Sequence, residues 1–269
     1  MMPLPVPAHS GFLGGVLLIL WPMATVRKEP AAAAVELVAQ RFVAAEVALL
    51  AGSVMRGEDT ETSDLDVVVV YARLDHAHRE SFMHAGWPVE AFVHDPETLE
   101  FFYERDRASG VPVLLDMVVT GVPLPRATSF ARRVQARAES VLRLGPSPWG
   151  AADIERSRYT ITALCEDLRG ARSQDERVAI ATALYPAAAD HFFRARNRWS
   201  ARGKNLLGLW QREAPELATE FRAGFRELHE RADAKPAIAA CSKILQPYGG
   251  WLFDGYKVDA ACNWRKDLP

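Results

Sequence analysis

The chain has 269 residues, of which 49% are hydrophobic and 25% charged, so it can form one large domain or two modest ones with real cores. Its formal net charge of -2 disfavours a dedicated nucleic-acid binder, because such proteins carry an excess of Lys and Arg. The three cysteines are odd in number and far apart, which argues against a disulfide framework or structural zinc and indicates a cytoplasmic protein.

An apolar run, GFLGGVLLILWPM, occupies residues 11–23. It is shorter than the roughly 20 residues that a membrane-spanning helix needs, and no Lys or Arg precedes it, as a signal peptide would require. Three interpretations stay open: a start placed too early, with the native chain beginning near Met23; a hydrophobic segment packed on the body; or a membrane signal. We favour the first, set residues 1–22 apart from the folded domains, and expect no membrane partner.

The first half of the chain alternates between helical and strand patterns. Apolar residues at helical spacing predict a helix over 30–42, and a short buried strand follows at 47–50. A polar loop over 52–63 then leads into LDVVVVY at 65–71, whose β-branched residues predict a central strand. Beyond it we expect a short helix over 76–83, a strand over 89–93, a helix over 96–106 and a strand over 113–119.

The pattern changes after the cluster GPSP at 145–148, which is the best linker in the sequence. Apolar residues then recur at i, i+3, i+4 and i+7, first over 161–168 and again over 180–187, as on the buried side of a helix. We therefore expect an α+β protein in which an α/β half over 23–146 precedes an all-helical half over 149–269, with a cleft between them.

Two carboxylates, Asp64 and Asp66, lie two residues apart at the start of the predicted central strand. Side chains so spaced point to one face of a strand, with Cα atoms about 6.5 Å apart. They repel each other unless a cation lies between them, and Mg²⁺ favours this oxygen-rich arrangement. A third carboxylate should come from a neighbouring strand. Glu90 is the first candidate and Asp116 the reserve.

Phosphate-binding residues are expected just before these carboxylates. Gly52 allows the backbone to approach a ligand closely, so that successive N–H groups can hold phosphate oxygens. Ser53 adds a hydroxyl donor and Arg56 a positive charge. In the helical half, Lys204 follows a glycine ahead of an apolar helix, which makes it the first choice for a triphosphate contact.

Taken together, GS at 52–53, RG at 56–57, SDLD at 63–66 and Glu90 resemble the polymerase-β-like nucleotidyltransferase superfamily. The chain is most similar to its small bacterial aminoglycoside and lincosamide enzymes. They pair a catalytic α/β domain, with a mixed sheet and flanking helices, with a C-terminal helical bundle that binds substrate and nucleotide. Two positions depart from the pattern. Ala51 replaces a common first glycine, and the third acid is Glu rather than the commoner Asp.

The resemblance implies a role for each residue. The metal ligands and catalytic residues are Asp64, Asp66 and Glu90. The nucleotide-binding residues are Gly52, Ser53, Arg56, Ser63 and Lys204. The implied cofactors are two Mg²⁺ ions, with Mn²⁺ as a substitute, and the co-substrate is ATP or another NTP. The general base stays open among Glu90, Glu166 and Asp167.

We therefore expect a nucleotidyltransferase that moves an NMP, with AMP from ATP as first choice, onto a hydroxyl of a small acceptor such as an antibiotic, releasing pyrophosphate. A second hypothesis is a regulatory or toxin–antitoxin-type module of the same fold that acts on a protein partner. Nucleotide addition to RNA is a third, against which the pI of about 6.4 argues. The sequence names neither the acceptor nor the oligomeric state.

Overall fold

A mixed five-stranded sheet forms the centre of the N-terminal half in the computed structural model, which describes residues 27–259. The apolar run at 11–23 therefore lies outside the described residues. In chain order the elements are α1 (Pro30–Arg41), β1 (Val47–Ala51), α2 (Gly52–Met55), β2 (Leu65–Val70), β3 (His78–His84), β4 (Trp87–His94), α3 (Pro96–Ser109), α4 (Val113–Thr120), β5 (Val122–Leu124), α5 (Ser129–Leu144), α6 (Ala151–Gly170), α7 (Gln174–Arg194), α8 (Lys204–Glu213), α9 (Pro215–Arg231), α10 (Lys235–Leu245) and a 3₁₀ turn (Gln246–Tyr248).

The strand order is β3-β4-β2-β1-β5, which places β2 at the centre of the sheet. β2 and β4 run parallel, and the other neighbouring strands are antiparallel. Asp66 of β2 lies opposite Glu90 of β4 on one side and opposite Ala51 of β1 on the other. The predicted α+β class, with a mixed sheet, flanking helices and a helical C-terminal half, is confirmed.

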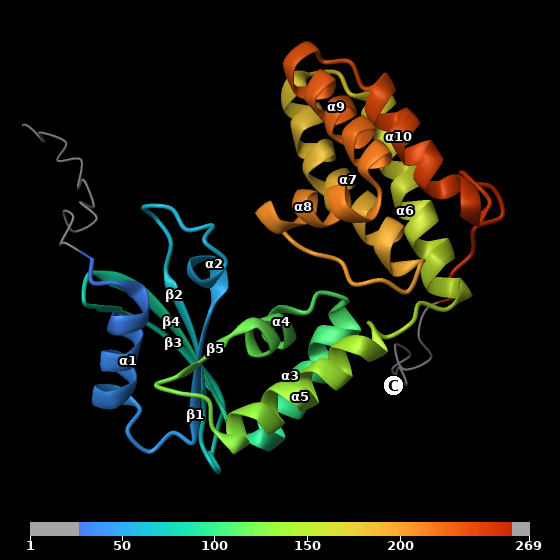
Figure 1. The fold of residues 1–269 in the computed structure, drawn as a ribbon. Coiled ribbons are helices and arrows are strands. Elements are labelled where there is room, and N and C mark those ends of the chain that lie inside the picture. Colours follow the sequence, from blue (N-terminus) through green and yellow to red (C-terminus); the bar gives the residue numbers. More distant parts are fainter. Residues whose placement is uncertain (1–26, 260–269) are drawn as a thin grey trace, which may run out of the picture.

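Helices cover both faces of the sheet, which explains why its central strands are continuously apolar. Side chains alternate along a strand. Leu49 and Val68 therefore pack with α3, α4 and α5, whereas Leu50 and Val67 face the other way and pack with α1. Figure 1 shows α1 on one side of the sheet and α3, α4 and α5 on the other.

The helix predicted over 76–83 is wrong, because this segment forms the edge strand β3. A two-residue turn at Ala85 and Gly86 joins it to β4, and both residues have positive φ, 46° and 83°. Such turns match the twist of an antiparallel hairpin. Pairing with β4 therefore decides the structure of a segment whose residues alternate between exposed and half-buried positions.

The strand predicted over 113–119 is also wrong, because these residues form α4. Its β-branched, apolar sequence is typical of a buried strand. The Asp106 carboxylate, however, accepts hydrogen bonds from the backbone N–H groups of Leu114 and Leu115, at 2.8 and 2.9 Å. These bonds satisfy donors that the first turn of a helix leaves free. Asp116 consequently lies on a helix and is exposed.

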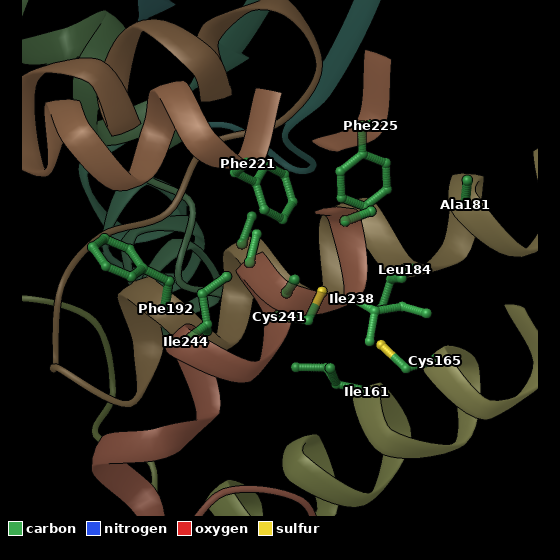
Figure 2. Close-up of a cluster of buried hydrophobic side chains, with 14 of the residues drawn as sticks. Ile161, Cys165, Ala181, Leu184, Phe192, Phe221, Phe225, Ile238, Cys241 and Ile244 are labelled. Atoms are coloured by element: carbon green, nitrogen blue, oxygen red, sulfur yellow. The ribbon is translucent and has the colours of Figure 1, made fainter. Parts of the chain in front are cut away.

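The C-terminal half consists of α6 to α10 around a separate apolar core. Trp210, Phe221 and Phe193 are its largest fully buried side chains. Figure 2 shows part of this core, in which the thiols Cys165 and Cys241 lie among aliphatic and aromatic side chains. Within residues 27–259, no helix has both the length and the apolar character that crossing a bilayer requires.

Specific contacts join the two halves next to the predicted linker. The Arg194 side chain, buried at the end of α7, donates to Ser147 O at 2.8 Å and to Ala108 O at 3.3 Å. Gly110 allows this path, because a Cβ there would lie 2.1 Å from Arg194 Nη1. Ser200 N also donates to Gly110 O at 2.7 Å. These hydrogen bonds therefore fix the chain where it passes from one half to the other.

Candidate active site

Three carboxylates meet at the end of the sheet where β2 begins. Asp64, Asp66 and Glu90 each offer an oxygen, and these oxygens lie within 4.8 Å of one another. Asp66 and Glu90 are partners in the parallel pairing of β2 and β4, and Asp64 stands directly before β2. Among residues 27–259, this is the one group of three or more His, Cys, Asp or Glu side chains that comes close enough to hold a metal ion.

The Asp66 carboxylate lies in an unfavourable electrostatic environment. Its pKa is raised from 3.8 to about 6, mainly by burial and next by the negative charges of Asp64 and Glu90. The positive charges of Arg56 and Arg79 oppose this rise in pKa. The cluster therefore holds more negative charge than its surroundings compensate, and a cation would relieve this.

A tight turn brings the backbone of Gly52 against the cluster. Gly52 has a φ of 81°, which favours glycine, and a Cβ at this position would lie 2.1 Å from Asp66 Oδ2. The antiparallel pairing of β1 and β2 causes this approach, because it sets Ala51 opposite Asp66. A side chain at position 52 would occupy the space where the carboxylate lies.

Hydrogen bonds between serine side chains hold together the segment that joins β1 and β2. Ser53 Oγ donates to Ser63 Oγ at 3.3 Å, and Ser63 Oγ accepts from Thr60 N at 2.9 Å. Both serine side chains are buried, which is uncommon for hydroxyls that have no structural or binding role. Arg56 follows on the exposed side of the loop, where its Nε donates to Glu58 at 2.9 Å.

The structure brings most of the predicted site residues together and places a few elsewhere. Lys204 is exposed at the first position of α8, which lies in Figure 1 on the side of the helical half nearest α2. Glu166 and Asp167 are exposed on α6, where Glu166 pairs with Arg169. Asp116, the reserve third acid, is not part of the carboxylate group.

One residue of the site was missed by reasoning from the sequence. Arg79, on β3, forms an ion pair with Glu90, and its guanidinium carbon lies 5.2 Å from the centre of the Phe92 ring. The prediction of a helix over 76–83 hid this contact, because it removed the strand that lies beside β4. Gly86, directly before β4, was the sequence signal for a tight hairpin turn that could have revealed it.

Comparison with known proteins adds little to this geometry. No family model and no curated protein matches the chain. Among solved structures, it is similar to a nucleotidyltransferase-like protein from Exiguobacterium sibiricum, with 9% identity and a TM-score of 0.42. The match covers 81% of this chain and 74% of that one. A likeness this low assigns neither a family nor an activity.

Proposed function

We propose that this chain is a nucleotidyltransferase of the polymerase-β-like type. It moves an NMP, with AMP from ATP as first choice, onto a hydroxyl of a small acceptor such as an antibiotic. The acceptor oxygen bonds to the α-phosphorus, the bond to the departing phosphate oxygen breaks, and pyrophosphate and a proton leave. The observation that carries the proposal is the cluster of Asp64, Asp66 and Glu90 beside the Gly52 turn.

The donor set fits hard divalent cations. Three carboxylates supply only oxygen ligands, as Mg²⁺ and Mn²⁺ prefer, and they lack the nitrogen and sulfur donors typical of zinc sites. The negative charges of Asp64 and Glu90, which contribute to the raised pKa of Asp66, favour a cation of either kind at this cluster. When bound, two such ions neutralise phosphate charge and make the acceptor hydroxyl more acidic.

The chain's own residues position the reactants around this centre. Asp64 and Asp66 hold the cations, and the missing side chain at Gly52 leaves room for the Asp66 carboxylate. We assign the backbone of Gly52 to the phosphate oxygens. We assign Arg56 and Ser53 to the β- and γ-phosphates. Arg56 supplies a positive charge, and the Ser53 hydroxyl would exchange its bond to Ser63 Oγ for one to a phosphate oxygen. Positioning and charge compensation of this kind supply most of the rate in phosphoryl transfer.

Glu90 is the best placed of the three candidate bases. It belongs to the carboxylate cluster, where it can take the proton of the acceptor hydroxyl. Glu166 and Asp167 are exposed on α6 in the other half and do not belong to the cluster. We assign the sheet half over 23–146 to catalysis. The helical half over 149–269 binds the acceptor and supplies Lys204 to the triphosphate.

The test is release of pyrophosphate from ATP and Mg²⁺ with a panel of hydroxyl-bearing acceptors, antibiotics included. Asp66→Asn should lower the rate at least a hundredfold, as removal of one preorganised charge typically does. Asp254→Asn, at an exposed position on the C-terminal segment, is the matched control and should keep the wild-type rate. Full activity in a variant lacking both Asp64 and Asp66 would refute the proposal. A stoichiometric protein partner without turnover would favour a regulatory module instead.

A further inference from the structure

A cavity of about 630 Å³ lies entirely within the helical half. The end of α6 and the start of α7 form one side, and one face of α10 forms another. Lys235, Ile238, Ala239 and Ser242 stand on that face at i, i+3, i+4 and i+7, so the cavity follows the axis of α10. This volume lies within the range of pockets that bind small organic molecules.

Positive charge dominates the walls. Arg169, Arg177 and Lys235 line the cavity, against the single carboxylate of Asp233. The Asp233 carboxylate is hydrogen-bonded at the start of α10, where its Oδ1 accepts from the backbone N–H of Lys235 at 3.0 Å. Arg169 is paired with Glu166, so Arg177 and Lys235 against Asp233 leave the cavity with a net positive charge, which favours an anionic ligand.

The two arginines are held in place by contacts with other residues. Arg177 Nη2 donates to Ala171 O at 3.1 Å, which leaves its remaining N–H groups for a ligand. Arg169 pairs with Glu166, and its guanidinium carbon lies 5.7 Å from the centre of the Trp251 ring. A preordered guanidinium loses little conformational entropy when an anion binds.

The floor and one wall of the cavity are apolar. Leu168 and Ile238 are buried and belong to the core cluster, part of which Figure 2 shows with Ile238 labelled. Trp251 remains 36% exposed although it contacts Arg169, so part of its apolar ring still faces water. A flat ligand body could cover this indole face and the aliphatic floor, and so remove apolar surface from water.

We propose that this cavity binds a small organic anion that carries one carboxylate or phosphate group on a planar apolar body. The anionic group contacts Arg177 and Lys235, and the planar body lies against Trp251. The connection between α9 and α10 lines the cavity, and Figure 1 shows this connection at the end of the helical half away from the sheet. The site is therefore distinct from the carboxylate cluster, and it does not depend on nucleotidyl transfer.

Isothermal titration calorimetry with three matched probes tests this proposal. The probes are 2-naphthoate, 2-naphthyl phosphate and the uncharged 2-naphthamide. At least one anion should bind with 1:1 stoichiometry and at least tenfold more tightly than the amide, because each charge-assisted hydrogen bond contributes about that factor. The anion that binds more tightly identifies the head group.

Variants then locate the binding site. Arg177→Gln and Lys235→Gln should each weaken binding of the anion about tenfold and leave the far-ultraviolet circular dichroism spectrum unchanged. Arg222→Gln, at an exposed position on α9 that does not line the cavity, is the control and should bind as wild type. Asp66→Asn should also retain binding, which separates this site from the carboxylate cluster. Equal binding of amide and anions, or unaltered affinity in both cavity variants, would overturn the proposal.

Discussion

Replacing Asp66 by asparagine should stabilise the protein while abolishing its response to divalent cations. Asparagine has nearly the same shape but carries no charge, so it removes the repulsion from Asp64 and Glu90 without creating a cavity. Burial and this repulsion raise the pKa of Asp66 from 3.8 to about 6. Between pH 3.8 and about 6, the Asp66 carboxyl is therefore still protonated in the folded state but already ionised in the unfolded state. The wild-type protein should therefore lose stability as pH rises through this window.

The size of the effect follows from the pKa. Moving a pKa from 3.8 to about 6 corresponds to about 3 kcal/mol once the group is fully ionised. The Asp66 side chain is partly exposed, so solvent screening reduces this to about 1 to 2 kcal/mol above pH 7. For a chain of this length, each kcal/mol raises the melting temperature by about 2 to 4 °C.

Urea denaturation in EDTA, followed by circular dichroism from pH 4 to pH 8, measures the effect. The advantage of Asp66→Asn over wild type should be small at pH 4 and grow to its full value by about pH 7. Adding Mg²⁺ should stabilise the wild type and leave the variant unchanged, since only the wild type keeps the complete ligand set. A variant that is less stable than wild type at pH 8 would show that Asp66 has a structural role and would refute the electrostatic reasoning.

Two further predictions concern the helical half and its junction with the sheet. Burial lowers the pKa of His191 from 6.5 to about 4, so on acidification the unfolded state takes up a proton before the folded state does. The free energy of unfolding should therefore fall by about 2 kcal/mol between pH 7.5 and pH 5. The variant His191→Asn, which can keep the contact with Ser157, should remove that loss in the same denaturation assay. Gly110→Ala should cost at least about 2 kcal/mol more than Gly57→Ala, because both glycines have positive φ but only the Cβ at position 110 meets a side chain, that of Arg194. Equal costs for the two alanine variants would show that Arg194 moves aside freely.

Local sequence patterns were sufficient to predict the centre of the sheet. β1 is wholly apolar and β2 is apolar beyond Asp66, as helices on both faces of the sheet require, while β4 is apolar except at Glu90 and His94. The expectation that Glu90 would lie on a strand beside Asp66 also follows from this pattern, and the parallel pairing of β2 and β4 places the two residues opposite each other.

Contacts between neighbouring elements decided what the hydrophobic pattern of each segment did not. The residues of α4 favour a strand by composition, but Asp106, on the preceding helix, binds the backbone of Leu114 and Leu115 and starts a helix there. The pairing of Arg79 with Glu90 likewise depends on a hairpin whose turn is only two residues long. Neither effect appears in the hydrophobic periodicity of the segment concerned, because both depend on its neighbours.

The surroundings of the carboxylates distinguish a structural acid from a ligand-binding one. The Asp106 carboxylate accepts two backbone N–H groups at the start of a helix, and Asp95 caps α3 in a similar way. Both therefore stabilise the chain around them. Asp66 instead stands between two other carboxylates, opposed only by the charges of two arginines, so the folded protein is less stable because it is there. A cation would neutralise this uncompensated charge, so the surroundings of Asp66 agree with the metal site that the proposed function requires.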